Sequence, residues 1–293
     1  ACSNNGYSQQ FHFGLSEQSM GDLIDGDDGW KVEEVGIWAK DKLSSLCRYL
    51  DISRGVRSKW IGPTKGGATY IDLFCGTGRS KVRSTGEFID GSCVAAWKES
   101  QKATPFTQIY IADLDPERRG LAAERLRRAG APVIEVQGDA ITAACTIRSH
   151  LSLHGLHFCF VDPYSLGAFD FEILRTFAGL KYIDILVHVS KMDLQRNTKM
   201  NIRAQQDDFD SFAPGWRTAI DTSQNHSTVR RLVFDYWRDR VEELGISASA
   251  AMELITGEQG QHLYWLTLIA KNNLAHKFWK TAVNKTGQGS LFD

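Results

Sequence analysis

The stretch that decides the fold is Tyr70-Ile71-Asp72-Leu73-Phe74-Cys75-Gly76-Thr77-Gly78. An apolar run ends here in an acidic residue and a turn that carries glycines at alternate positions. Glycine permits backbone angles and a close approach that a Cβ would block. In open α/β sheets, ligands bind beyond the carboxyl ends of the strands, at the point where the strand order reverses. We therefore expect a doubly wound α/β domain with a ligand site at Asp72, Phe74, Gly76 and Gly78.

The glycines must first be compared with the dinucleotide-binding fingerprint G-x-G-x-x-G, of which Gly76-Thr77-Gly78 supplies two glycines. Lys81 stands at the third position, where a side chain hinders the close packing of helix and strand. The next strand, Ile109 to Ala112, ends at Asp113. This acid lies further along than the roughly 20 residues after the glycines at which the fingerprint places its ribose-binding acid. The sequence therefore disfavours a cofactor with a pyrophosphate.

A nucleoside cofactor without phosphates needs a close backbone for its amino-acid end and a carboxylate for its ribose hydroxyls. It also needs an acceptor for its adenine amine. Asp113 can accept both ribose hydroxyls, as the acid at the second strand does in nucleotide-binding halves. A third strand, Pro132 to Val136, leads into Asp139, whose carboxylate can accept from the adenine amine. We therefore expect S-adenosylmethionine as the cofactor.

A fourth apolar strand, Leu156 to Val161, stops at Asp162-Pro163-Tyr164. Its length and composition are typical of a strand that is buried on both faces. Methyl transfer to an amino group needs an acceptor that orients the amine and a ring that holds a planar substrate. Asp162 can serve as the first and Tyr164 as the second, because flipped bases are held by edge hydrogen bonds and stacking. A capping or turn role is the alternative for Asp162.

These motifs together resemble those of class I S-adenosylmethionine-dependent methyltransferases. They are Asp72-x-Phe74-x-Gly76-x-Gly78, Asp113, Asp139 and Asp162-Pro163-Tyr164, in this order. From about Val35 onward, the chain more narrowly resembles the three-Cys-motif partner family, TcmP. The supporting segments are residues 38–49, 111–118, 161–164, 192–197 and 277–279. The resemblance implies a partner protein with a three-cysteine motif. Amino-methyltransferases of DNA usually carry Asp-Pro-Pro-Tyr, and the second proline is missing here, which counts against base methylation.

The remaining pattern predicts a Rossmann-like, mostly parallel sheet of about seven strands. Residues 1–32 are rich in small and polar residues and are expected to form an irregular arm, whereas 33–293 form a methyltransferase-like domain. Within this domain, residues at about 195–245 depart from the α/β repeat and predict a helical insertion. The final strands, Met252 to Thr256 and Leu263 to Ala270, are expected to pair antiparallel at the sheet edge.

Charge and cysteine content limit the classes of function. The 34 basic and 35 acidic residues give a net charge of −1, so no global field attracts nucleic acid. Nucleic acid would have to use a local patch such as the arginines of residues 118–128, which a solvated helix face explains equally well. Six scattered cysteines form no C-x-x-C pair and have no histidine at zinc spacing. We therefore expect reduced thiols, no metal site and a cytoplasmic location. No apolar run is long enough to enter a membrane as a span.

Two hypotheses from different classes remain. The first is an S-adenosylmethionine-dependent methyltransferase that acts on an amino group, such as that of a nucleic acid base. The second is a non-catalytic methyltransferase-like module that binds the cofactor or a three-Cys-motif partner protein. Two further features also have two interpretations. His188 is either a core histidine or a proton-handling group near the cleft, and Arg79 to Gly91 is either a lid or a surface loop without a role.

Overall fold

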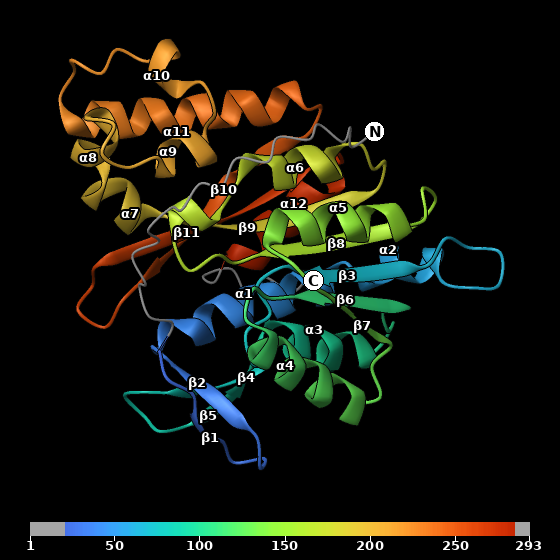
Figure 1. Ribbon diagram of the computed structural model, residues 1–293. Helices are drawn as coiled ribbons and strands as arrows, with labels where there is room; N and C mark the ends of the chain where they lie inside the picture. The colour runs from blue at the N-terminus through green and yellow to red at the C-terminus, as the bar shows by residue number, and fades with distance from the viewer. Residues whose placement is uncertain (1–20, 285–293) are drawn as a thin grey trace, which may run out of the picture.

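The computed structural model describes residues 21–284, which are built around one seven-stranded sheet (Figure 1). The strands are β3 (Ala68–Asp72), β6 (Gln108–Ala112), β7 (Val133–Val136), β8 (Leu156–Val161), β9 (Ile183–Ser190), β10 (Ser247–Thr256) and β11 (His262–Ala270). Their spatial order is β10-β11-β9-β8-β3-β6-β7. Strand β3 pairs in parallel with both β6 and β8. The strand order therefore reverses at β3, which confirms the doubly wound, mostly parallel sheet expected from the sequence.

The last two strands form the antiparallel edge that the sequence predicts. Strand β11 runs antiparallel to β9, and β10 runs antiparallel to β11. Strand β10 begins earlier than expected, at Ser247, because a register shift between Ala248 and Met252 lets the strand continue through an irregular stretch. The sheet is thus extended at one edge by strands that need no crossover helix.

Helices cover both faces of the sheet. Successive side chains of a strand point to opposite faces, so neighbouring apolar residues are buried under different helices. Tyr70 belongs to a core that includes residues of α1 (Trp38–Ile52), α3 (Ser92–Gln101), α4 (Pro116–Arg128) and α12 (Asn273–Val283). The next residue, Ile71, packs with α5 (Ala140–His150), α6 (Phe171–Ala178) and the helices of the insertion. Both side chains have no exposed surface.

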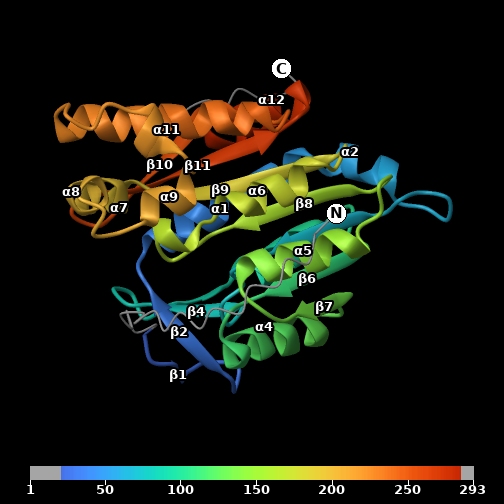
Figure 2. The same cartoon turned by 45° about the horizontal axis from the view of Figure 1, so that its top comes forward.

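The segment between β9 and β10 is helical, as the sequence predicts. It contains α7 (Lys191–Arg196), α8 (Thr198–Ile202), α9 (Asp208–Phe212), α10 (Trp216–Ala219) and α11 (His226–Glu243). Figure 2 shows these helices beside the β10 edge of the sheet. Phe209, Phe212, Trp216 and Trp237 are fully buried there. These aromatic side chains therefore form the core of the insertion.

A second, four-stranded sheet lies below the carboxyl edge of the large sheet in Figure 1. Its strands are β1 (Ile24–Asp25), β2 (Lys31–Val35), β4 (Arg79–Val82) and β5 (Phe88–Asp90), in the order β1-β2-β4-β5. Residues 21–32 of the expected irregular arm are thus partly strand, whereas residues 1–20 lie outside the described residues. The polar insertion 79–91 is the β4–β5 hairpin, held by β2 through parallel pairing. We call these four strands the accessory sheet.

Within residues 21–284, the structure contains no helix with the length and apolar character of a membrane span.

Candidate functional site

The glycine turn after β3 has a backbone that only glycine adopts easily. Gly76 has φ +54° and Gly78 has φ +75°. A Cβ on Gly76 would lie 2.5 Å from Glu33 Oε1, and one on Gly78 would lie 3.0 Å from the Ala122 Cα of α4. The β4–β5 hairpin follows this turn, so α3 begins only at Ser92. The turn therefore does not lead directly into a helix N-terminus of the kind that holds a pyrophosphate.

Asp113 joins the end of β6 to the glycine turn. Its Oδ2 accepts a hydrogen bond from the Gly76 backbone N–H at 3.0 Å, and its Oδ1 accepts from the Asp115 N–H at 3.0 Å. Burial raises the pKa of this carboxyl, while the two backbone hydrogen bonds oppose the rise. The structure thus brings Gly76 and Asp113 together, as the sequence predicts for the carboxyl ends of neighbouring parallel strands.

Asp72 lies beneath the turn and is fully buried. It accepts hydrogen bonds from Ser92 Oγ at 2.6 Å and the Tyr70 hydroxyl at 3.1 Å. The Phe74 N–H also donates to it, at 3.3 Å. Burial raises the pKa of Asp72 to about 7, although its hydrogen bonds favour the charged form. Asp72 therefore fixes the turn and the start of α3, while the partly buried Phe74 packs against the α5–α6 core.

Asp139 lies at the end of the third parallel strand, where the sequence places an adenine acceptor. It is exposed, and its Oδ1 accepts from the Thr142 N–H at 2.8 Å as the N-cap of α5. Such a cap satisfies one of the free N–H groups at a helix start. Within residues 21–284, its other carboxylate oxygen accepts no hydrogen bond and can accept from a further donor.

Asp162 is held by two side chains from separate elements. One carboxylate oxygen accepts from Lys42 Nζ of α1, and the other lies 3.0 Å from His188 Nδ1 of β9. Burial alone would raise the pKa of Asp162, but Lys42 and His188 together hold it well below its usual range. His188 also contacts the Tyr264 ring, with centroids 3.9 Å apart. His188 is thus part of a polar cluster at the carboxyl edge of the sheet.

Tyr164 is only two residues from Asp162 but lies in a different environment. Its side chain is 69% exposed, whereas that of Asp162 is 14% exposed. Leu114, which follows Asp113, is likewise 69% exposed. Two large apolar or aromatic side chains therefore project from the loops after β6 and β8, where they can contact a planar ligand.

Two residues of this site lie outside the motifs that the sequence singled out. Glu33 of β2 faces the glycine turn, and its Oε2 lies 2.6 Å from Arg118 Nη1. Burial raises the pKa of Glu33 against the opposing effect of Arg118 and Lys42. Lys42 shares a helix stripe with Ser45 and Tyr49, at spacings of three and four residues. This spacing is the one signal that places Lys42 on the face of α1 that covers the sheet.

Most arginines of α4 form neither of the two surfaces expected from the sequence, which were a patch for nucleic acid and a solvated helix face. Arg118, Arg119 and Arg125 are 5%, 7% and 6% exposed, so they form neither a surface patch nor a solvated face. Arg127 and Arg128 are exposed. Arg118 and Arg125 are buried against Glu33 of β2 and Asp28 of the β1–β2 turn, whereas Arg119 lies against Glu135 of β7 and the Asp113 carbonyl. Local sequence periodicity does not reveal these contacts.

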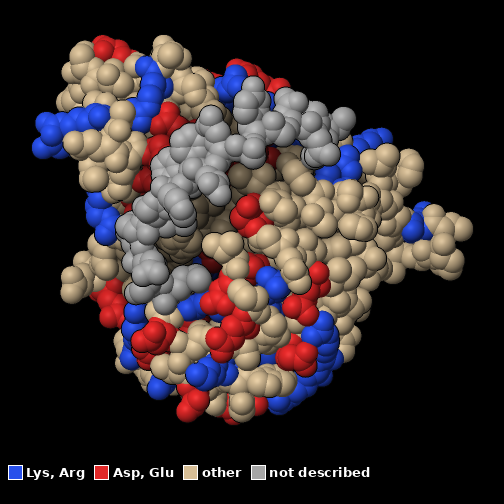
Figure 3. Space-filling view, in the orientation of Figure 1, with Lys and Arg blue, Asp and Glu red and all other residues tan. Residues whose placement is uncertain are grey.

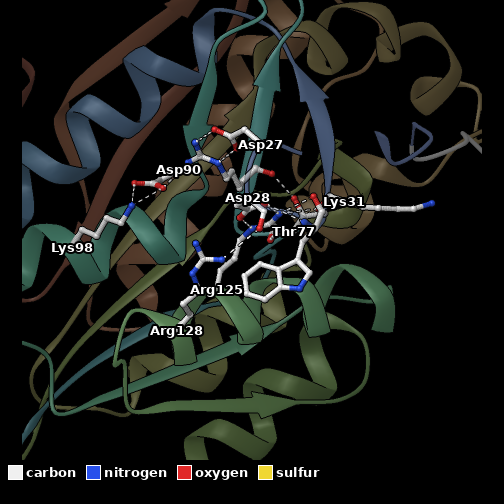
Figure 4. Close-up of polar contacts among 10 residues, drawn as sticks. Asp27, Asp28, Lys31, Thr77, Asp90, Lys98, Arg125 and Arg128 are labelled. Carbon is white, nitrogen blue, oxygen red and sulfur yellow. Dashed lines mark hydrogen bonds and ion pairs between the residues drawn. The ribbon is translucent and has the colours of Figure 1, made fainter. Parts of the chain in front are cut away.

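Figure 4 shows how this packing supports the glycine turn. Arg125 binds both carboxylate oxygens of Asp28, at 2.7 and 2.9 Å, and donates to the Thr77 carbonyl at 2.6 Å. Arg79 of β4 binds Asp27 through two contacts of 2.6 Å. The accessory sheet is therefore fastened to the glycine turn through Arg125. On the face shown in Figure 3, acidic and basic side chains are interspersed over this region.

The described cysteines form no disulfide, and burial keeps the thiol of Cys75 protonated. Cys75, inside the glycine turn, is 3% exposed, and burial raises the pKa of its thiol well above the usual range. It therefore stays protonated at neutral pH. Cys2 lies outside the described residues. Within residues 21–284, no group of three or more His, Cys, Asp or Glu side chains is arranged to hold a metal ion.

No family model and no curated protein matches this chain. Several solved structures are similar in shape at low sequence identity. The O-methyltransferase TomG from Streptomyces achromogenes, in complex with SAM, is 15% identical over 78% of this chain and 79% of that chain, with a TM-score of 0.43. Trm1 from Pyrococcus horikoshii, with S-adenosyl-L-methionine, is 9% identical over 81% of this chain and 57% of that chain, with a TM-score of 0.44.

An O-methyltransferase from Bacillus cereus, in complex with SAH, is 12% identical over 80% of this chain and 87% of that chain, with a TM-score of 0.43. Likenesses of this degree carry no argument about the site. The order and direction of the strands themselves establish a Rossmann-like α/β fold, with a mostly parallel sheet of seven strands and an antiparallel edge.

Proposed function

We propose that this chain is an S-adenosylmethionine-dependent methyltransferase whose cofactor binds at the carboxyl ends of β3, β6 and β8. The observation that carries the proposal is the glycine turn. It has two left-handed glycines at the point of strand reversal, with Asp113 hydrogen-bonded to Gly76. The Glu33 carboxylate occupies the space that a Cβ would need at Gly76, so only glycine lets the turn lie against this acidic side chain. The neighbouring carboxylate suits ribose hydroxyls.

Each residue around the turn binds a different part of the cofactor. The turn accommodates the amino-acid end, and Glu33, which faces Gly76, accepts from its ammonium group. Asp113 accepts from the ribose hydroxyls, and the exposed Leu114 covers the adenine ring. Asp139 accepts from the adenine amine through the carboxylate oxygen that does not cap α5. Asp72 acts indirectly, because its hydrogen bonds hold the turn in place.

When bound, S-adenosylmethionine supplies a methyl group on a positively charged sulfur. The chain must then align an acceptor with that methyl, and such alignment can lower a barrier by about 7–11 kcal/mol. We assign the acceptor to an amino group of a planar substrate, such as a nucleic acid base. The exposed Tyr164 stacks on the substrate and Asp162 accepts from its amine, which has to share the carboxylate with Lys42 and His188.

We further propose that the chain belongs with the TcmP family and acts with a three-Cys-motif partner protein. The support is the sequence resemblance, together with the exposed Tyr164, which leaves room for a second surface beside the site. Arg127 and Arg128 are the exposed arginines of α4, and a nucleic acid would compete for Arg127 with Glu124 and Glu135. A cytoplasmic location fits free thiols, because oxidising compartments favour disulfides.

One observation favours the alternative, a non-catalytic module that binds the cofactor or the partner. Asp162, which would orient the acceptor amine, already accepts from Lys42 and His188. A carboxylate held in this way stabilises the fold whether or not a methyl group is transferred. The two functions therefore share the cofactor site and differ in what Asp162 does.

Calorimetric titration with S-adenosylmethionine, with NAD as the control ligand, tests the cofactor site. We expect micromolar binding of S-adenosylmethionine alone. Asp113→Ala should weaken it at least about tenfold, equivalent to roughly 1.4 kcal/mol. Asp221→Ala, which removes an exposed carboxylate outside the site, should leave the affinity unchanged. Absent binding, or equal affinity in the Asp113 variant, would contradict the assignment.

Asp162→Asn then separates the enzyme from the module, since it keeps the size of the side chain. The measurement is transfer of a labelled methyl group to nucleic acid, in the presence of the partner protein, alongside calorimetry. Lost transfer with retained cofactor binding supports catalysis. An unchanged partner-dependent function would support the module.

A further inference from the structure

A cavity of about 570 Å³ lies at the end of the sheet opposite the glycine turn. It is lined by the first residues of β8 and β9, by α1 and α2 (Arg54–Arg57), and by the start of α12. The amino ends of parallel strands are at the far edge from their carboxyl ends. This cavity is therefore separate from the proposed cofactor site.

Six aromatic side chains line the cavity. They are Tyr49, Trp60, Phe106, Phe158, Tyr182 and Phe278. The Trp60 and Tyr182 rings have centroids 4.3 Å apart. Flat aromatic surfaces of this kind favour a planar ligand, because stacking adds to the burial of apolar area. The volume lies within the range of small-molecule sites.

The inner part of the cavity carries a buried hydrogen-bond acceptor. Asp184 Oδ2 accepts from the Tyr49 hydroxyl at 2.6 Å, and within residues 21–284 no cation forms an ion pair with this carboxyl. His157 also lines the cavity, but its side chain points to the other face of the sheet, because Asp184 is in register with the next residue, Phe158. The Asp184 carboxyl therefore suits a ligand that donates a hydrogen bond.

The outer part of the cavity is basic. Lys181 and Lys271 line it and are exposed. Arg57, which also lines it, is already committed, because it donates to the Leu50 and Thr104 carbonyls and lies 4.6 Å above the Phe106 ring. The charge therefore changes along the cavity, from the Asp184 carboxyl within to the ammonium groups of Lys181 and Lys271 outside, of which Lys181 lies 5.0 Å from the centre of the Tyr182 ring.

We propose that this cavity is a second ligand site, which binds a planar heterocycle that carries an exocyclic amine and an anionic group. The ring lies among the aromatic side chains, the amine donates to Asp184, and the anion binds Lys181 and Lys271. An adenine mononucleotide has this combination of groups. The inference does not depend on the proposed methyl transfer.

Calorimetry on the full chain with AMP, adenosine and IMP tests the site. AMP should bind, and IMP, which has an oxygen in place of the amine, should bind at least tenfold more weakly. Adenosine, which lacks the phosphate, should also bind at least tenfold more weakly. Failure of AMP to bind, or equal binding of AMP and IMP, would overturn the proposal.

Variants locate the binding. The double change Lys181→Ala and Lys271→Ala removes exposed side chains only, so the fold should persist, and it should reduce AMP affinity to that of adenosine. Asp184→Asn should weaken AMP at least tenfold without changing the affinity for S-adenosylmethionine. Asp113→Ala should leave AMP binding unchanged. If the Asp113 variant loses AMP, or the lysine variant keeps it, AMP binds elsewhere and the second site is refuted.

Discussion

Two carboxyl groups that contact α1 differ in pKa, because the helix offers each of them a different partner. Asp162 of the β8 end and Asp184 of β9 each accept from a side chain of α1, Lys42 and Tyr49 respectively. The pKa of Asp162 is held below its usual range by Lys42 and His188, against the effect of burial. Burial raises the pKa of Asp184 to about 6, and only the Tyr49 hydrogen bond opposes it.

The difference lies in the partner rather than in the depth of burial. A cation stabilises the charged form of a buried carboxyl, whereas a neutral hydroxyl offsets only part of the desolvation cost. Ser45, between the two on the same helix stripe, donates to Glu253 of β10. The α1 helix is thus fastened to three strands. Its charged contact lies toward the proposed cofactor site and its neutral contact toward the second cavity.

Removal of the charged contact should have the largest effect. In Lys42→Met, Asp162 loses its cation and remains mostly buried, so the free energy of unfolding at pH 7 should fall by about 3–5 kcal/mol. Urea unfolding measures this change. The double variant Lys42→Met with Asp162→Asn removes the buried charge as well and should recover most of the loss. Equal stability of the single and double variants would show that Asp162 gains nothing from Lys42.

The neutral contact should appear instead as a pH dependence. Asp184 has a pKa of about 6 in the folded chain and an ordinary value of 3.8. As pH rises between these values, the unfolded chain loses this proton first, so stability falls and stays low above pH 6. The shift of about two units corresponds to at most about 3 kcal/mol. Asp184→Asn should remove this decline.

Urea unfolding of the wild-type chain and of Asp184→Asn at pH 4, 5, 6 and 7 gives the free energy of unfolding of each chain. The difference between these two free energies is then followed as a function of pH. Asp72, whose pKa burial raises to about 7, contributes a decline of the same sign to both chains and therefore cancels. A constant difference across this pH range would mean that Asp184 titrates normally. An exposed control, Asp221→Ala, should not alter the slope between pH 5 and 7. The Ser223 and Gln224 hydrogen bonds hold the pKa of Asp221 at about 2, so this carboxyl is ionised there in both the folded and the unfolded chain.

The sequence predicts those parts of the site that are marked by a pattern of neighbouring residues. An apolar run followed by glycines predicts both β3 and its turn, and parallel pairing then brings Asp113 to Gly76. Glu33 carries no such signal, and the helical spacing of Lys42 to Ser45 and Tyr49 indicates only a shared face of α1. The positions of Glu33 and Lys42 depend on how β2 and α1 pack against distant strands. The buried Arg125 was missed for a related reason. Its partner Asp28 is 97 residues away and belongs to a segment whose composition favours irregular structure.

The smallest effect should come from Tyr49→Phe, which keeps the ring and removes the hydroxyl that Asp184 accepts. Loss of this hydrogen bond should cost about 1 kcal/mol at pH 7. It should also raise the pKa of Asp184 further, because Tyr49 lowers it in the wild-type chain. The loss of stability should therefore be larger at pH 8 than at pH 4, where Asp184 is largely protonated in both chains. Paired urea titrations at the two pH values measure this, and an equal loss at both would place the effect in packing rather than in the charge of Asp184.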